Sequence, residues 1–183
     1  MQSLSELTHH RWALPVLAHV ADQGGAKFVT LSRQLHVSPP SLTRALVRLQ
    51  LLGLVVRNPG YGHPMRPEYV LGPVGERANG LPQAIVEWIH KGGLERELLK
   101  KWHLPVLLAL GPHTHRFGEV RGRLPGASPR ALALALKGNA SLGLVDREVD
   151  QTRYPPVPLY TSTMRAAPGR EPARLLGEVL AAG

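Results

Sequence analysis

Apolar residues in the first half of the chain recur first with the spacing of an α-helix and then with that of β-strands. Over residues 42–49 three leucines and an alanine fall on one helical face, and Gly53 ends that stretch. Residues 54–57 form an apolar run typical of a strand, residues 58–62 are rich in turn residues, and residues 67–71 form the returning strand. The pattern predicts a long helix followed by a β-hairpin.

Shorter elements precede and follow this unit. Ser3 and Glu6 have the spacing of a capping box that opens a helical stretch running to Val20, within which Pro15 predicts a kink or a fresh helix start. The remaining predicted elements are a loop over 21–26, a short helix over 30–35 capped by Thr30, a cap for the long helix at Ser38, and a final helix over 82–90. This order predicts a winged helix-turn-helix, a mainly α fold with small β-hairpin wings (α+β).

The second half of the chain repeats the first. Residues 11–17 (RWALPVL) recur as residues 101–107 (KWHLPVL), and the register is one residue shorter only over the segment that contains Phe28 and Leu35. Further aligned pairs are Ser38 and Ser128, Leu42 and Leu132, Gly53-Leu54-Val55 and Gly143-Leu144-Val145, Arg57 and Arg147, and Pro82 and Pro172. Because such self-similarity indicates tandem units, we expect two modules, residues 1–92 and 93–183, joined through residues 81–99 and related by an approximate two-fold or screw.

The net charge of the chain limits the kinds of partner that we expect it to bind. The 22 Lys and Arg residues exceed the 13 Asp and Glu residues, so the net charge is +9, which is typical of proteins that bind double-stranded DNA. No run of 18 apolar residues is present and the first residues do not resemble a secretory signal, so we expect no membrane partner and a cytoplasmic, nucleoid-associated protein. The absence of cysteine excludes disulfides and thiolate-zinc sites.

The second half also carries a stretch specific to one family. Residues 116–130 (RFGEVRGRLPGASPR), followed by residues 143–147 (GLVDR), closely resemble the signature of HxlR-type transcriptional regulators. In the first half, residues 31–39 and 53–57 are similar to the broader winged-helix set that includes MarR-type regulators. The resemblance implies transcriptional control by two DNA-reading modules, which a homodimer normally supplies and which one chain supplies here. Members that sense electrophiles use a cysteine near the start of the fold, so that mode of sensing does not carry over.

In the first half, the predicted long helix is the candidate recognition helix. Ser41, Thr43 and Arg44 lie off its apolar stripe, as do Val47 and Arg48, and Arg44 is the best candidate for a guanine contact. The candidate DNA-binding residues here are Thr30, Arg33, Ser38, Ser41, Thr43, Arg44 and Arg48 on the helices, and Arg57, His63 and Arg66 on the wing. The alternative is that these arginines form a solvated helix face.

The second module differs at the same positions. Ala133 and Leu134 stand where the first module has Thr43 and Arg44, so we expect the second module to anchor on phosphates or to dimerise. The candidate DNA-binding residues here are Arg116, Arg121, Arg123, Ser128, Arg130, Lys137, Arg147 and Arg153. The alternatives are an exposed basic surface without a partner, or Leu134 packed in an interface between modules or chains.

Other chemistry has little support. The pairs His9-His10 and His113/His115 lack an acidic or cysteine partner at a metal-site spacing, and no catalytic motif is present, so we expect no metal, no cofactor and no enzyme. Trp12 and Trp102 are interpreted as packing residues, although related regulators place small-molecule cavities there, which leaves an effector open.

Two questions of organisation remain open. Leucines in the terminal helices, over 4–8 and 172–180, predict a homodimer, the alternative being a monomer whose halves pair with each other. An architectural or scaffolding role on DNA is the alternative function, because tandem winged helices also serve chromosome-organising complexes.

Overall fold

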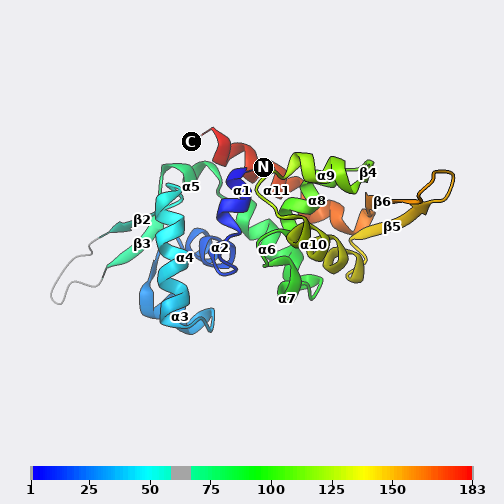
Figure 1. The fold of residues 1–183 in the computed structure, drawn as a ribbon. Coiled ribbons are helices and arrows are strands. Elements are labelled where there is room, and N and C mark those ends of the chain that lie inside the picture. The colour runs from blue at the N-terminus through cyan, green and yellow to red at the C-terminus, as the bar shows by residue number, and fades with distance from the viewer. Residues whose placement is uncertain (1, 59–66, 183) are drawn as a thin grey trace.

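The computed structural model describes residues 2–58 and 67–182, and Figure 1 shows two winged units on either side of a central group of helices. The first unit comprises α1 (Gln2–Leu7), α2 (Ala13–Gln23), β1 (Ala26–Lys27), α3 (Phe28–Gln34), α4 (Pro39–Leu51), β2 (Val55–Asn58), β3 (Glu68–Leu71), α5 (Pro73–Arg77) and α6 (Leu81–Lys91). The second comprises α7 (Glu95–Leu98), α8 (His103–Leu110), β4 (Thr114–Arg116), α9 (Phe117–Arg123), α10 (Pro129–Ser141), β5 (Val145–Asp150), β6 (Val157–Ser162), the 3-10 helix Met164–Ala166 and α11 (Ala167–Ala181).

Each unit contains a three-stranded antiparallel sheet of the same topology. The strand order is β1-β3-β2 in the first and β4-β6-β5 in the second, so a short strand before the helix-turn-helix pairs with the returning strand of the wing. The two wings project from opposite ends of the molecule (Figure 1). The α+β winged helix-turn-helix fold is therefore confirmed, in two copies.

The predicted apolar stripe of the long helix is the centre of each unit's core. Leu42, Leu46 and Leu49 of α4 are at most 1% exposed, and Leu132 and Leu136 of α10 are buried in the same way. Burial of each such side chain contributes about 1.5 to 3 kcal/mol, which is why these positions persist in both copies. Leu42 and Leu132 thus occupy equivalent core positions, as the duplication predicts.

Helix starts at the two prolines also agree with the sequence. Trp12 and Trp102 are the N-cap residues of α2 and α8, which places Pro15 and Pro105 in the first turn of their helices. Proline is tolerated there because a first-turn N–H has no partner within the helix.

The predicted helical stretch from Ser3 to Val20 is divided into α1 and α2, and the fresh start at Ala13, just before Pro15, is as predicted. One prediction at the start of the fold was wrong. Thr30 does not cap the short helix, because α3 begins at Phe28 directly after the pairing of Lys27 with Glu68, and Lys27 is its N-cap. The strands β1 and β4 and the helix α5 were not predicted.

The alignment of the two halves after the wings also needs correction. Val55 pairs with Leu71, and its counterpart Val145 pairs with Ser162, so the wing of the second copy is one residue longer. The returning strand of the second copy is therefore offset from the first by 91 residues and not by 90.

The two halves pack on each other through α6 and α11, with α1 against α11 (Figure 1). Trp88 of α6 lies so close to Gly169 of α11 that a Cβ at that glycine would overlap the indole ring. Leu4, Leu7 and Leu176, the kind of leucines that suggested a homodimer, are fully buried within the single chain. No helix in the described ranges is long and apolar enough to cross a bilayer.

Candidate nucleic-acid interface

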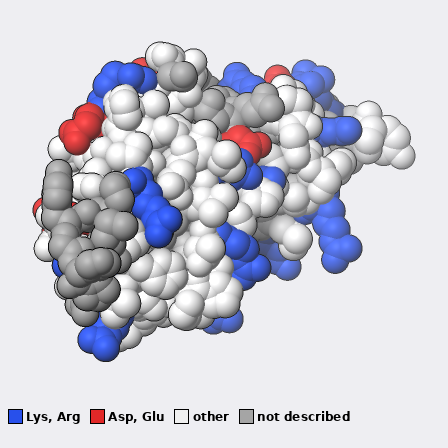
Figure 2. All heavy atoms as spheres, turned by 90° about the vertical axis from the view of Figure 1, so that its left-hand side faces the viewer, with Lys and Arg blue, Asp and Glu red and all other residues white. Residues whose placement is uncertain are grey.

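The solvent-facing side of α4 presents the residues expected to meet DNA. Thr43, Arg44 and Val47 are exposed there, while Ser41 is half-buried. Within the described part of the chain, Arg44 makes no hydrogen bond or ion pair, so its guanidinium is free to bind. Figure 2 views the molecule from the end formed by the first module, where blue Lys and Arg side chains outnumber the red acidic ones.

The hydroxyl groups beside Arg44 are already engaged as donors. Thr43 Oγ1 donates to the carbonyl oxygen of Pro39 at 2.9 Å, and Ser38 Oγ donates to Ser41 Oγ at 3.0 Å. Because a hydroxyl retains acceptor lone pairs after donating, Thr43 can still accept from an amino group of adenine or cytosine. The exposed face of α4 therefore offers a hydrogen-bond acceptor that is held in place, on Thr43, next to a free cationic donor, Arg44.

Arg48 is directed away from this face. Its Nη1 lies 2.8 Å from Glu6 Oε2, an ion pair that joins α4 to α1. The guanidinium therefore has a structural partner within the chain. Sequence reasoning grouped Arg48 with Arg44 because the helical pattern alone does not show where α1 lies.

The remaining candidates of the first module lie around α4. Thr30 and Arg33 are exposed on α3, Ser38 is the exposed N-cap residue of α4, and Arg57 is exposed on β2. His63 and Arg66 lie outside the described residues. The wing is thus represented only by its two strands.

The recognition helix of the second module is exposed but apolar at its centre. Ala133 and Leu134 face solvent, with Leu134 59% exposed, so Leu134 is not packed between the modules. Arg130 and Lys137 are exposed on the same helix. Ser128 caps it, its Oγ accepting from the backbone N–H of Ala131 at 3.2 Å.

The arginines around α9 divide into free and structural groups. Arg123 donates to the carbonyl oxygen of Ala109 and contacts His115 Nε2 at 2.8 Å, so it joins α9 to the end of α8 and to β4. Arg116 is half-buried, and its backbone N–H donates to Glu119 at 2.6 Å, which lowers the pKa of that carboxyl. Arg121 is exposed and makes no ion pair in the described ranges.

The second wing is acidic as well as basic. Asp146 and Glu148 are exposed on β5 beside the exposed Arg147. Arg153 lies 3.4 Å from Asp150, whose pKa is lowered chiefly by hydrogen bonds from Thr152. These carboxylates oppose a close approach of phosphate, and Arg153 is partly neutralised.

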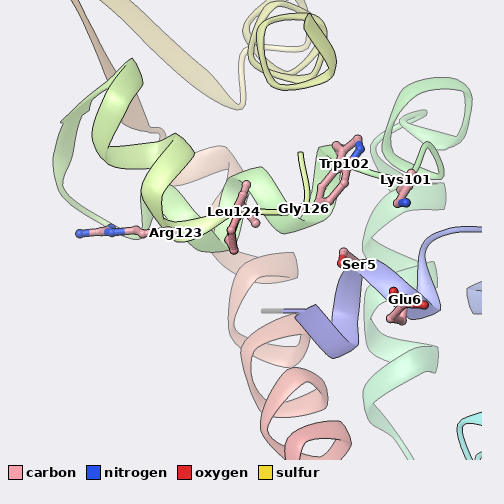
Figure 3. A pocket seen from close by; sticks show the side chains of 8 residues that line it. Ser5, Glu6, Lys101, Trp102, Arg123, Leu124 and Gly126 are labelled. Carbon is pink, nitrogen blue, oxygen red and sulfur yellow. The ribbon is translucent and has the colours of Figure 1, made fainter. Parts of the chain in front are cut away.

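Each of the two equivalent tryptophans lines a cavity near the junction of the modules. Trp102 borders one of about 310 Å³, where Ser5 and Glu6 from α1 lie opposite Lys101 and the indole (Figure 3). Trp12 borders another of about 410 Å³, which includes Arg44. The Arg11 and Lys101 side chains lie over the Trp12 and Trp102 rings, 5.3 and 5.0 Å from the ring centroids.

Histidines of both pairs contact other side chains of the fold. His9 and His10 pack edge to face with ring centroids 5.0 Å apart. His115 contacts Arg123, and its Nδ1 lies 3.7 Å from Glu119. Within the described ranges, no three His, Cys, Asp or Glu residues come together as a metal site would require.

The match to a known protein family agrees with this fold. The family described as HxlR-like helix-turn-helix matches the chain twice, over residues 7–96 and 97–179. A putative transcriptional regulator of the MarR family from Porphyromonas gingivalis W83 is 24% identical, with a TM-score of 0.39 over 46% of this chain and 78% of that chain. The diamide-treated YodB structure from B. subtilis is 27% identical, with a TM-score of 0.37 over 47% of this chain and 81% of that chain. No curated protein matches the sequence.

Proposed function

The chain belongs to the HxlR-like helix-turn-helix family of DNA-binding transcriptional regulators, and we propose that its first module reads base edges while its second anchors on phosphates. We place the division between the modules at Gly92-Gly93, between the end of α6 at Lys91 and the start of α7 at Glu95. One chain would thereby supply both modules to double-stranded DNA, in the cytoplasm at the nucleoid.

The observation that supports this division is the chemistry of equivalent positions on α4 and α10. Thr43 and Arg44 in the first helix correspond to Ala133 and Leu134 in the second, and all four are exposed. Arginine donates two hydrogen bonds to guanine, whereas leucine offers only apolar contact with a thymine methyl group. Base discrimination therefore favours the first module.

Phosphate anchoring by the second module is supported by its free cations. Arg121, Arg130 and Lys137 are exposed and without an acidic partner in the described ranges, whereas Arg123 is occupied by the carbonyl of Ala109. Each phosphate neutralised by such a cation releases condensed counterions, so its contribution is independent of sequence and falls with salt. The second module would add affinity and little selectivity.

The packing of α6 on α11 favours a monomer whose halves pair with each other over a homodimer. A dimer built on the terminal helices would need apolar surface that the single chain already buries at Leu4, Leu7 and Leu176. Sedimentation as a 19.9 kDa species at micromolar concentration is the expected result. A species of twice that mass would show that a second interface exists.

Selection of bound fragments from random duplex DNA, at two salt concentrations, tests the proposed function. A regulator should enrich one sequence at about physiological salt and bind it about 10³-fold or more tightly than random DNA. An architectural protein should enrich no sequence and show only a steep dependence on salt. The second result would overturn the proposal.

Replacing Arg44 tests the role of the first module. We expect Arg44→Ala to lose about 1 to 3 kcal/mol on the selected site and to relax preference at one base position. Arg121→Ala should weaken all sequences alike and lower the salt slope by about one unit, and Leu134→Ala is the matched control on α10. Unchanged preference in Arg44→Ala together with lost preference in Arg130→Ala would reverse the assignment.

A further inference from the structure

The cavity beside Trp12 is built by both modules. Residues 9–12, which join α1 to α2, line it together with Ser41 and Arg44 of α4 and with residues 99–101, which precede α8. Its volume is about 410 Å³, within the range of small-molecule sites. We call it the inter-module cleft.

Its lining carries uncompensated positive charge. Lys100 is paired with Glu97 at 2.6 Å, but Arg11, Arg44 and Lys101 have no acidic partner in the described part of the chain. Among the described residues, none with a carboxylate lines the cleft. Like charges that line one cavity repel each other, so an anion in the cleft would be stabilised.

Two of these cations are held in place before any ligand arrives. Arg11 lies over the Trp12 ring and Lys101 over the Trp102 ring, and the two pairs occupy equivalent positions in the two modules. Cation–π contacts restrict a flexible side chain without neutralising its charge. The entropy that the side chains would lose on binding an anion is thereby reduced.

His10 in the cleft lies in the same positive surroundings. The pKa of His10 is lowered first by partial burial and then by His9, Arg48 and Arg44. A neutral imidazole can still donate one hydrogen bond to an oxyanion. Any bound anion would raise the pKa of His10, since it would offset the neighbouring cations.

The cavity beside the equivalent tryptophan, Trp102, provides an internal comparison. Glu6 lines that cavity together with Lys101 and Arg123, and Figure 3 shows its carboxylate below the indole. The same tryptophan position therefore has a carboxylate in one cavity and none in the other. Of these two cavities, the inter-module cleft is the one without an acidic group to oppose an anion.

We propose that the inter-module cleft is a phosphate-binding site, with Arg11, Arg44 and Lys101 as its ligands. The proposal deepens the proposed function, because Arg44 also belongs to the reading face of α4. The phosphates come either from the DNA backbone between the two recognition helices or from a free polyphosphate compound. A phosphate of the first kind sets the register of both modules on DNA, and one of the second kind competes with DNA for Arg44.

Two titrations of the full chain test the site. The first measures binding of a fluorescent random-sequence duplex by anisotropy over a series of salt concentrations, for wild type, Arg11→Gln and Lys101→Gln. The second measures binding of tripolyphosphate by calorimetry for the same proteins. Arg174→Gln is the control, since it removes one positive charge from α11, outside the cleft, where Arg174 is already paired with Glu171 and Glu178.

If the DNA backbone fills the cleft, each variant should lower the salt slope by about 0.9 and bind random DNA several-fold more weakly than the control does. If a free polyphosphate fills it, wild type should bind tripolyphosphate, lose DNA in its presence, and bind it about tenfold more weakly after either substitution. Slopes and tripolyphosphate binding equal to those of the control in both variants would overturn the proposal.

Failure of this inference can be told apart from failure of the proposed function. A chain that enriches one DNA sequence but keeps its salt slope in Arg11→Gln and Lys101→Gln is a regulator without this site. A chain that enriches no sequence but loses slope or tripolyphosphate affinity in both variants has the site without the proposed reading function. Equal unfolding midpoints of the variants and wild type establish that the comparison concerns folded protein.

Discussion

The two recognition helices have the same length and the same packing, but their exposed faces differ in chemistry. Both α4 and α10 span 13 residues, begin with proline after a serine N-cap, and bury a leucine and alanine stripe. On the outside, Thr43 is replaced by Ala133 and Arg44 by Leu134. Packing constrains the residue type at core positions in both copies, whereas at exposed positions only binding constrains the residue type. This difference supports the proposal that the two copies bind different features of DNA.

The two modules also differ in a buried polar contact between two helices. Asn139 and His103 of the second module stand where the first has Leu49 and Ala13. The amide of Asn139 donates to the carbonyl oxygen of His103 at 3.0 Å. The second module thus joins α10 to α8 with a hydrogen bond where the first uses apolar contact alone.

The largest expected effect concerns the contact that holds the two modules together. We expect Gly169→Ala to lower the free energy of unfolding by about 1 to 3 kcal/mol, because the added Cβ overlaps the Trp88 ring and α11 must move from α6. Urea denaturation measures this change.

Gly177→Ala is the matched control on the same helix, since nothing lies within 4 Å of a Cβ at that position. Alanine has the higher helix propensity, so this variant should be as stable as wild type or up to about 1 kcal/mol more stable. Equal stability of the two variants would contradict the packing of α11 on α6.

An intermediate effect should appear in the pH dependence of stability. Burial lowers the pKa of His103 from its ordinary value of 6.5, and Glu97, 3.9 Å away, only partly offsets this. Below pH 6.5 the ring is protonated in the unfolded chain more readily than in the folded chain. The free energy of unfolding therefore falls as the pH falls. Above pH 6.5 the ring is neutral in both states and contributes no pH dependence.

His103→Ala removes this contribution and leaves Glu97, Lys100 and Asn139, the groups that face the ring. Its stability between pH 7 and pH 5 should fall less steeply than that of wild type, whatever its absolute value. Chemical denaturation at several pH values measures both slopes. Parallel curves would show that His103 is not buried as described.

The smallest effect is expected at the ion pair that turns Arg48 toward α1. Glu6 is 41% exposed in its side chain and Arg48 25%, so Glu6→Gln should cost only about 0.2 to 1 kcal/mol, and less at high salt. Glu87→Gln, which removes the exposed pair with Lys91, is the control and should cost no more. A loss that grows with salt would exclude an electrostatic origin.

Local sequence patterns were sufficient to predict most of the fold. The apolar stripe of α4, the strands β2 and β3, and the helix starts near Pro15 and Pro105 depend on neighbouring residues, and all are present. By contrast, β1 is only two residues long and forms because it pairs with β3, a contact that periodicity does not register. The strands β1 and β4, which form through distant pairing, were missed for this reason.

The same distinction between local pattern and distant contact applies to the residues of the candidate site. The exposure of Thr43 and Arg44 follows from helical spacing and was predicted. The pairing of Arg48 with Glu6 and the binding of Arg123 to Ala109 depend on where α1 and α8 lie, so spacing alone could not separate these arginines from the free ones. The resemblance pointed to a cavity near Trp12, but the cationic lining of the inter-module cleft comes from both halves of the chain and could not be predicted from either half alone.

Exchanging the chemistry of the two helices tests the central claim most directly. DNA fragments selected by wild type, by Arg44→Leu and by Leu134→Arg should be compared at one salt concentration. The account predicts a single half-site for wild type, loss of that half-site in Arg44→Leu, and a second guanine-containing half-site at fixed spacing in Leu134→Arg. Two half-sites selected by wild type, or an unchanged half-site in Arg44→Leu, would contradict it.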